Sequence, residues 1–199
     1  MTDKKFMTDD KSDENVKAIG PWKRTSKREV YDNSWINVSH QEVITPAGTQ
    51  GVYGVIHFKH YALGIVPLDQ HNNTWLVGQF RYALNEFSWE IPMGGGALSE
   101  PPLISAQREL QEETGLCGGD WQQLFKIHTS NSVTDEQGYV FMAENLIQAE
   151  QHLDPSEGDL IVKQLPFSDA VAMVLRGEIT DAITMAALLH VDRLLNERD

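Results

Sequence analysis

Apolar and polar residues alternate along much of the chain from Pro21 onward, as they do in half-buried strands. Polar turn clusters at 45–51 and 69–73 separate the alternating segments. The segments predicted as strands in the first half are Arg28–Tyr31, Trp35–Ser39, Val52–Phe58, Tyr61–Leu68, Trp75–Tyr82 and Trp89–Met93. Three glycines, Gly94–Gly96, follow the last of them and are expected to let the backbone turn sharply and come close to a ligand or an ion.

Helical spacing begins after these glycines. Residues Leu103–Thr114 place Ile104, Ala106 and Leu110 toward one side, and Gly115 follows where helices favour glycine. Further strands are predicted at Trp121–His128, Tyr139–Ala143 and Leu160–Leu165, and helices at Ser168–Leu175 and Asp181–Asn196. Strands mixed with few helices predict an α+β layered fold rather than a regular βαβ array.

The composition divides the 199 residues into three parts. Residues 1–18 carry many charges and almost no apolar residues, which predicts a disordered acidic tail. Residues 19–59 are predicted to form a small antiparallel β-sheet, and residues 60–199 to form the main domain.

Charge and targeting signals narrow the class of protein. The net charge of −13 argues against a nucleic-acid partner, because an acidic surface repels phosphates. No apolar run is long enough to cross a membrane, and the first residues lack a secretory signal. The single cysteine, Cys117, excludes an intrachain disulfide. These features together predict a cytoplasmic protein.

Three carboxylates, Glu109, Glu112 and Glu113, stand three or four residues apart on the predicted helix. Like charges at that spacing destabilise a helix, so a cation is expected between them. Carboxylate oxygens are hard ligands that suit Mg²⁺ or Mn²⁺ better than zinc. Arg108 can hold a carboxylate through its forked guanidinium. A solvated acidic helix face is the alternative.

The segment Gly94–Leu116 reads Gly, five residues, Glu100, seven residues, then Arg-Glu-Leu, one residue, Glu-Glu, one residue and Gly-Leu. It resembles the Nudix hydrolase signature at every defined position. The strands before it, including Val77–Tyr82 and Trp89–Gly95, are similar to those of ADP-ribose and nucleoside-diphosphate-sugar pyrophosphatases. The resemblance implies that residues 60–199 form a catalytic domain, an α/β/α sandwich with a mixed β-sheet. It also implies that the small N-terminal sheet of residues 19–59 serves dimerisation and base binding.

The resemblance also implies a reaction and a metal site. Such enzymes hydrolyse the diphosphate of a nucleoside diphosphate sugar, for example ADP-ribose, to a nucleoside monophosphate and a sugar phosphate. Two or three Mg²⁺ ions are implied, with Mn²⁺ as a substitute. Glu109 and Glu113 correspond to the primary ligands, and Glu112 to a ligand of another ion or a water-mediated partner. The backbone carbonyl of Met93 supplies a further ligand, and Arg108 orients the glutamates.

The general base is expected in the loop before a late strand. Glu157 is the first candidate, followed by Asp159 and Asp154. An exposed acidic turn, or a glutamate of the signature as base, is the alternative. Glu100 belongs to the signature as well, and both a structural pairing and a chemical role are open for it.

Arg81 lies in a Gln-Phe-Arg sequence that relatives use near the diphosphate or the distal sugar. A surface arginine paired with one of many acids is the alternative. Glu136, in Thr-Asp-Glu, is expected to contact substrate or metal, and Glu90 to face the metal pocket. For both, a role outside the site stays open.

An aromatic residue of the N-terminal sheet is expected to stack on the base. Tyr53 matches this position best, followed by Trp35 and Trp22, and core positions in the small sheet are the alternative. The resemblance further implies a homodimer with domain-swapped N-terminal sheets. Gly54 and Phe58 stand where the ADP-ribose branch carries a charged pair, which weakens the expectation of ADP-ribose specificity.

Three other functions remain open. A hydrolase that prefers GDP-mannose or ADP-glucose is the nearest alternative. A Nudix enzyme that removes damaged nucleoside triphosphates is less consistent with the ordered segment before Tyr61. A non-catalytic sensor of nucleotide sugars is the third, although such modules tend to lose glutamates of the signature that this chain retains.

Overall fold

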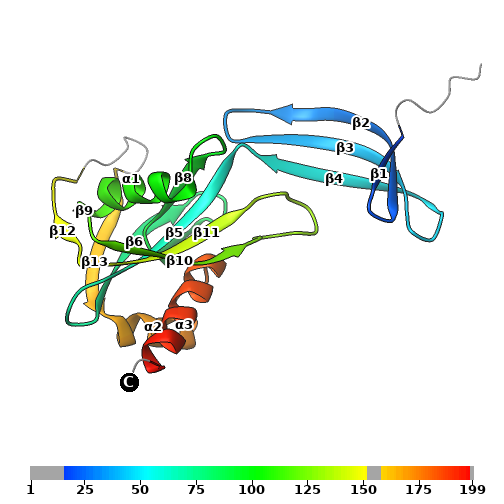
Figure 1. Ribbon diagram of the computed structural model, residues 1–199. Helices are drawn as coiled ribbons and strands as arrows, with labels where there is room; N and C mark the ends of the chain where they lie inside the picture. The colour runs from blue at the N-terminus through cyan, green and yellow to red at the C-terminus, as the bar shows by residue number, and fades with distance from the viewer. Residues whose placement is uncertain (1–15, 152–157, 198–199) are drawn as a thin grey trace, which may run out of the picture. The chain divides into compact units, whose positions relative to one another are not determined.

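The computed structural model describes residues 16–151 and 158–197 (Figure 1). The chain divides into two compact units between His57 and Phe58. The expected boundary lay two residues later, between 59 and 60. Each unit is built around its own sheets, and the second contains all the helices found in the described residues.

The first unit is a four-stranded sheet in the order β1-β2-β3-β4. Its strands are β1 (Lys17–Ile19), β2 (Trp22–Asp32), β3 (Ile36–Ile44) and β4 (Gln50–Phe58). Residues 17 and 18, expected in the tail, pair with β2 in register Lys17↔Arg24 and Ala18↔Lys23.

Trp35 departs from the predicted strand. It lies in the turn between β2 and β3, where its backbone N–H donates to Asn33 Oδ1 at 2.8 Å. The side chain is 63% exposed, so Trp35 is not a core residue of this sheet. The Asn33 side chain makes this turn by accepting two successive N–H groups, from Trp35 and Ile36.

The second unit centres on a mixed sheet in the order β10-β11-β5-β8. Its strands are β5 (His60–Leu68), β8 (Met93–Ala97), β10 (Asp120–Ile127) and β11 (Gly138–Glu144). Strands β5 and β11 are parallel, and the other two pairs are antiparallel.

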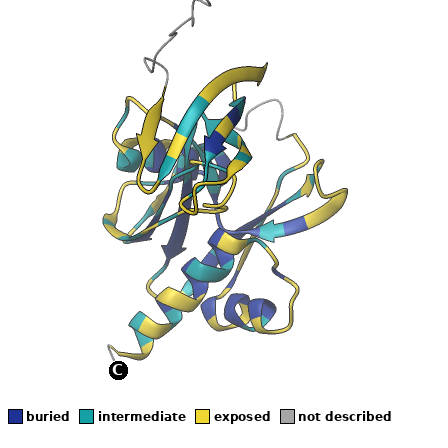
Figure 2. Ribbon diagram, turned by 90° about the vertical axis from the view of Figure 1, so that its right-hand side faces the viewer, coloured by how far each residue is buried: buried dark blue, intermediate teal, exposed yellow. Residues whose placement is uncertain are grey.

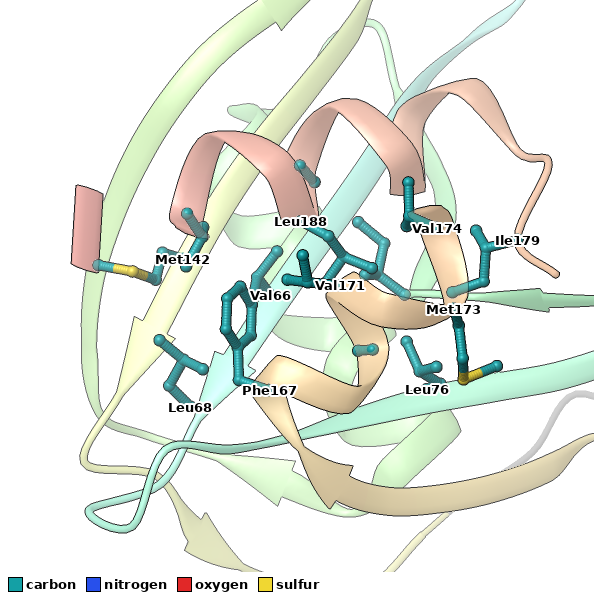
Figure 3. Close-up of a cluster of buried hydrophobic side chains, with 14 of the residues drawn as sticks. Val66, Leu68, Leu76, Met142, Phe167, Val171, Met173, Val174, Ile179 and Leu188 are labelled. Atoms are coloured by element: carbon teal, nitrogen blue, oxygen red, sulfur yellow. The ribbon is translucent and has the colours of Figure 1, made fainter. Parts of the chain in front are cut away.

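Both faces of this mixed sheet are covered by helices, because its central strands are apolar at successive positions. On β5, Leu63 and Ile65 pack with α1 (Pro102–Thr114), whereas Val66 and Leu68 pack with α2 (Phe167–Leu175) and α3 (Ala182–Asn196). Figure 2 shows the buried strands and the exposed outer side of α3, and Figure 3 shows the core under α2 and α3. The layers form the predicted α/β/α sandwich.

A second sheet of three strands has the order β13-β6-β7. Its strands are β6 (Asn73–Arg81), β7 (Glu86–Glu90) and β13 (Ile161–Pro166), while β9 (Leu116–Cys117) and β12 (Ile147–Gln148) form a separate short pair. The single strand predicted at Trp89–Met93 is wrong. The chain leaves β7 at Ile91, passes Pro92, which has no N–H to donate, and enters β8 of the other sheet.

Helix α1 follows the prediction except for its buried face. Its interior side carries Ala106 and Leu110, as expected, but Ile104 is 49% exposed. The rest of the buried face is polar and includes Glu109 and Glu113, so apolar spacing alone misjudged the orientation. The helix ends at Gly115, whose φ of 73° is the left-handed conformation predicted there.

Among the described residues, no helix has the length and apolar character needed to span a membrane.

Candidate active site

The glycines before α1 provide space rather than a turn. Gly94–Gly96 lie within strand β8, and none of the three has a positive φ, so the expected sharp turn is wrong. A Cβ atom at Gly94 would lie 2.1 Å from Oε2 of Glu109. The carboxylate of Glu109 therefore crosses directly over the backbone of β8, which only glycine permits at that position.

Glu113 lies one helical turn after Glu109 and is completely buried. Its Oε2 accepts a hydrogen bond from the backbone N–H of Met93 at 2.9 Å, at the start of β8. Glu109 is 8% exposed. Two carboxylates on one face of α1 thus contact the same strand, at its first two residues, directly after the crossing from one sheet to the other.

Arg108, which is more exposed than Glu109, links Glu109 to Glu112 and to β8. Its guanidinium pairs with Glu109 Oε1 at 2.8 Å and with Glu112 Oε2 at 2.9 Å, and it donates to the Gly95 carbonyl at 3.3 Å. Burial lowers the pKa of Arg108, but the charges and hydrogen bonds of Glu109 and Glu112 outweigh it, and the pKa is raised. Glu112 is half-buried and turned to Arg108, whereas Glu109 and Glu113 are buried.

Arg81 and Glu90 form a bidentate ion pair between β6 and β7. Arg81 Nε donates to Glu90 Oε1 at 2.8 Å, and its terminal nitrogen contacts the other carboxylate oxygen. The hydrogen bond to Glu90 raises the pKa of Arg81, against the effect of burial. The charges of Asp181 and Glu113 raise the pKa of Arg81 further.

A hollow of about 330 Å³ opens beside this ion pair. Its polar lining residues are Arg81, Ser88, Glu90, Thr180 and Asp181. Asp181 also caps α3 by accepting from the N–H of Thr184 at 2.7 Å. The hollow therefore presents carboxylates and hydroxyls around one arginine.

We expect Arg81→Met to lower the free energy of unfolding by about 3 kcal/mol, because Glu90 is 3% exposed and would be left as a buried charge without its partner. Urea denaturation followed by tryptophan fluorescence measures this. The double variant Arg81→Met/Glu90→Met should be more stable than the single variant, since no charge remains unpaired. A double variant less stable than Arg81→Met contradicts this account.

The remaining predicted residues lie in several places. Glu100 accepts a hydrogen bond from Ser105 Oγ in the first turn of α1, a structural pairing. Glu136 accepts one from Thr129 Oγ1 within the β10–β11 connection. Asp159 is exposed. Glu157 and Asp154 lie outside the described residues.

Tyr53 and Trp22 are neighbours on the first unit. Their rings meet edge to face with centroids 5.7 Å apart. They line a hollow of about 200 Å³ together with Ile19, Gln41, Val43 and Val55. Two aromatic rings beside one amide side chain suit a flat heterocycle. Trp35, in the β2–β3 turn, is not among the residues that line this hollow.

The donor set at α1 fits a divalent cation. Within 16–151 and 158–197, no three His, Cys, Asp or Glu side chains converge as a ready metal cluster. The two buried carboxylates nevertheless offer only oxygen donors, which Mg²⁺ and Mn²⁺ prefer. Buried carboxylates are costly to ionise without a cation, and Gly94 leaves the space that Glu109 needs.

Sequence reasoning missed three residues around this site. Asp181 was assigned only to the start of a helix, although an aspartate three residues before Thr184 is a capping signal. Gln148 and Gln151 donate to the last carbonyls of α1. Nothing in their local sequence pattern indicates that long-range contact.

Two family models match the chain. Residues 22–56 match the nucleoside diphosphate sugar hydrolase N-terminal domain, and residues 58–187 match the NUDIX domain. The two matches meet where the structure divides into its two units.

Individual relatives agree with these models. The chain is 36% identical over 134 residues to an ADP-ribose pyrophosphatase of Mycobacterium tuberculosis. The match covers 65% of this chain and 64% of the relative, so this chain spans just under two thirds of the relative's length. It is 28% identical over 171 residues to an ADP-ribose pyrophosphatase of Bacillus subtilis. That match covers 85% of this chain and 91% of the relative. A crystal structure of an ADP compounds hydrolase has the same fold, with a TM-score of 0.80 and 19% sequence identity. The match covers 92% of this chain and 98% of that one.

Proposed function

Since this chain belongs to the Nudix family, we propose that it hydrolyses the diphosphate of a nucleoside diphosphate sugar, with ADP-ribose as its preferred substrate. The products are a nucleoside monophosphate and a sugar phosphate. Relatives named ADP-ribose pyrophosphatase support this substrate, and the N-terminal domain match supports the sugar nucleotide class. The enzyme is a nucleoside-diphosphate-sugar pyrophosphatase that depends on a divalent metal.

One observation carries the proposal most strongly. The carboxylate of Glu109 passes over Gly94, and Glu113 binds the N–H of Met93, so both reach the same end of β8. Glu109, Glu113 and the Met93 carbonyl would hold two or three Mg²⁺ ions, with Glu112 as a ligand of another ion or a water-mediated partner. Bound there, Mg²⁺ neutralises the charge that develops on the phosphate oxygens.

This chain's own residues then have separate tasks. Arg108 keeps Glu109 and Glu112 in place through its paired hydrogen bonds. Glu157 takes the proton of the attacking water, and Arg81 binds the diphosphate or the distal sugar. The hollow beside Arg81 and Glu90 has room and hydroxyl partners for that sugar. Glu136 is a further contact to the substrate.

The nucleoside base binds in the hollow of the first unit. Tyr53 stacks on the base with Trp22 beside it. We further propose that the chain acts as a homodimer whose N-terminal sheets exchange, so that each base site serves the partner. Exposed apolar residues of the first unit, such as Val30, Tyr31 and Val52, are consistent with such an association.

A substrate panel with Mg²⁺ tests the proposed activity. ADP-ribose, ADP-glucose, GDP-mannose, UDP-glucose and oxidised dGTP are each incubated with the full chain, and phosphate is measured after phosphatase coupling. We expect the highest kcat/KM for ADP-ribose and no activity in EDTA. A preference for GDP-mannose or ADP-glucose would correct the substrate, and activity on oxidised dGTP alone would overturn the sugar nucleotide class.

A further inference from the structure

The last carbonyl groups of α1 need donors from outside the helix, because an α-helix leaves its final carbonyls without internal partners. The Leu110 carbonyl accepts from Thr114 Oγ1 at 2.6 Å, and the Gln111 carbonyl accepts from the N–H of Gly115 at 2.8 Å. The carbonyls of Glu113 and Thr114 come later in the helix. Their side-chain donors belong to a segment more than thirty residues further along the chain.

Two glutamine side chains provide these donors. Gln151 Nε2 donates to the backbone carbonyl of Glu113. Gln148 Nε2 donates to the backbone carbonyl of Thr114 at 3.2 Å. We call Gln148 and Gln151 the glutamine clamp. The clamp holds two successive carbonyls, and the first of them belongs to a buried carboxylate residue of the active site.

The backbone fixes the clamp in place. Strand β12, which contains Gln148, pairs with β9 directly after α1, and the N–H of Ala149 donates to the Gly115 carbonyl at 2.7 Å. A Cβ atom at Gly115 would lie 2.5 Å from Gln148 Nε2 and 2.8 Å from the Ala149 carbonyl oxygen. Gly115 is therefore needed for two reasons. A side chain there would block the close approach of the clamp, and the residue has a positive φ.

We propose that the glutamine clamp positions Glu113 and thereby sets the affinity of the site for its divalent cation. The proposal rests on the proposed function, in which Glu113 is a metal ligand. Glu113 is the next-to-last residue of α1, and helix ends fray when their carbonyls lack partners. With its carbonyl held by Gln151, Glu113 keeps the backbone conformation that directs its carboxylate to the N–H of Met93.

Gln151→Met and Gln148→Met test the clamp, because methionine keeps the length of the side chain and removes the donor. Binding of Mn²⁺ alone to the full chain is measured by electron paramagnetic resonance, without substrate. We expect the Kd for Mn²⁺ to rise about 10-fold in Gln151→Met, as for other partners of metal ligands. At saturating Mn²⁺ the KM should stay at the wild-type value. Gln148→Met should shift the Kd in the same direction.

The controls separate the clamp from the metal site and from general stability. Gln164→Met removes a hydrogen bond from β13 to Asp69, in the turn between β5 and β6, and should leave the Kd unchanged. Glu113→Gln should lose Mn²⁺ binding; if it binds as the wild type does, the metal assignment fails. If Glu113→Gln loses binding while both clamp variants keep the wild-type Kd, the clamp alone is refuted. Circular dichroism confirms that each variant is folded at the measuring temperature.

Discussion

Glu113→Gln should lower kcat on the order of 1,000-fold while leaving the fold intact. The substitution keeps the shape of the side chain, so the N–H of Met93 still finds an acceptor at the amide oxygen. It removes the negative charge of a completely buried carboxylate that, in the proposed site, holds a divalent cation. The measurement is kcat on ADP-ribose at saturating Mg²⁺, together with the midpoint of thermal unfolding.

Glu178→Gln is the matched control for this variant. Glu178 lies after α2 and is exposed. In the described structure, the side-chain hydrogen bonds of Glu178 are with Arg176. Its substitution should leave kcat at the wild-type value. If Glu113→Gln turns over substrate at the wild-type rate at saturating Mg²⁺, Glu113 is not a metal ligand, because a ligand cannot lose its charge without effect.

Gly94→Ala should lower kcat on the order of 100-fold and weaken Mn²⁺ binding. The added methyl group would overlap the carboxylate of Glu109, since its carbon would lie 2.2 Å from Cδ and 2.6 Å from Cγ. Glu109 must then leave its position over β8. Kinetics at varied Mg²⁺ and binding of Mn²⁺ alone both measure the displacement.

Gly51→Ala is the control, because a Cβ atom at Gly51 would make only ordinary contacts, at 3.5 Å with Thr45 and 3.6 Å with Val43. It adds the same methyl group to another strand, and should keep the wild-type kcat and unfolding midpoint. If Gly94→Ala also behaves as the wild type, Glu109 does not need the space above the glycine and its proposed role as a ligand is wrong.

The sequence predicted the fold well where one physical signal dominated. The alternating and continuous apolar runs located β5, β6 and β11, and the position of Gly115 located the end of α1. The signature implied the Nudix fold and family, which the family model and the structural match confirm. Helical spacing alone could not orient α1, because its buried face contains carboxylates that a hydrophobic pattern counts as exposed.

Other features depended on contacts that local patterns do not encode. The glycines of β8 suggested a turn, but the space they provide is required by Glu109 and Ser105 on a different element. Arg81 was interpreted as a substrate contact or a surface ion pair. The structure gives it a buried partner, Glu90, and leaves its contact with substrate as a proposal. The glutamine clamp joins residues more than thirty positions apart, so no short sequence window contains it.

The crossing at Ile91 and Pro92 has a consequence for how such an enzyme can change during evolution. Glu90 ends one sheet and Met93 begins the other, so only two residues separate the ion pair beside the hollow from the strand that receives Glu113. If the hollow binds the sugar, as proposed, a substitution that reshapes it also risks displacing the strand that receives Glu113. The first unit is compact in itself. If the base binds there, as proposed, divergence toward a new nucleoside is easier than divergence toward a new sugar.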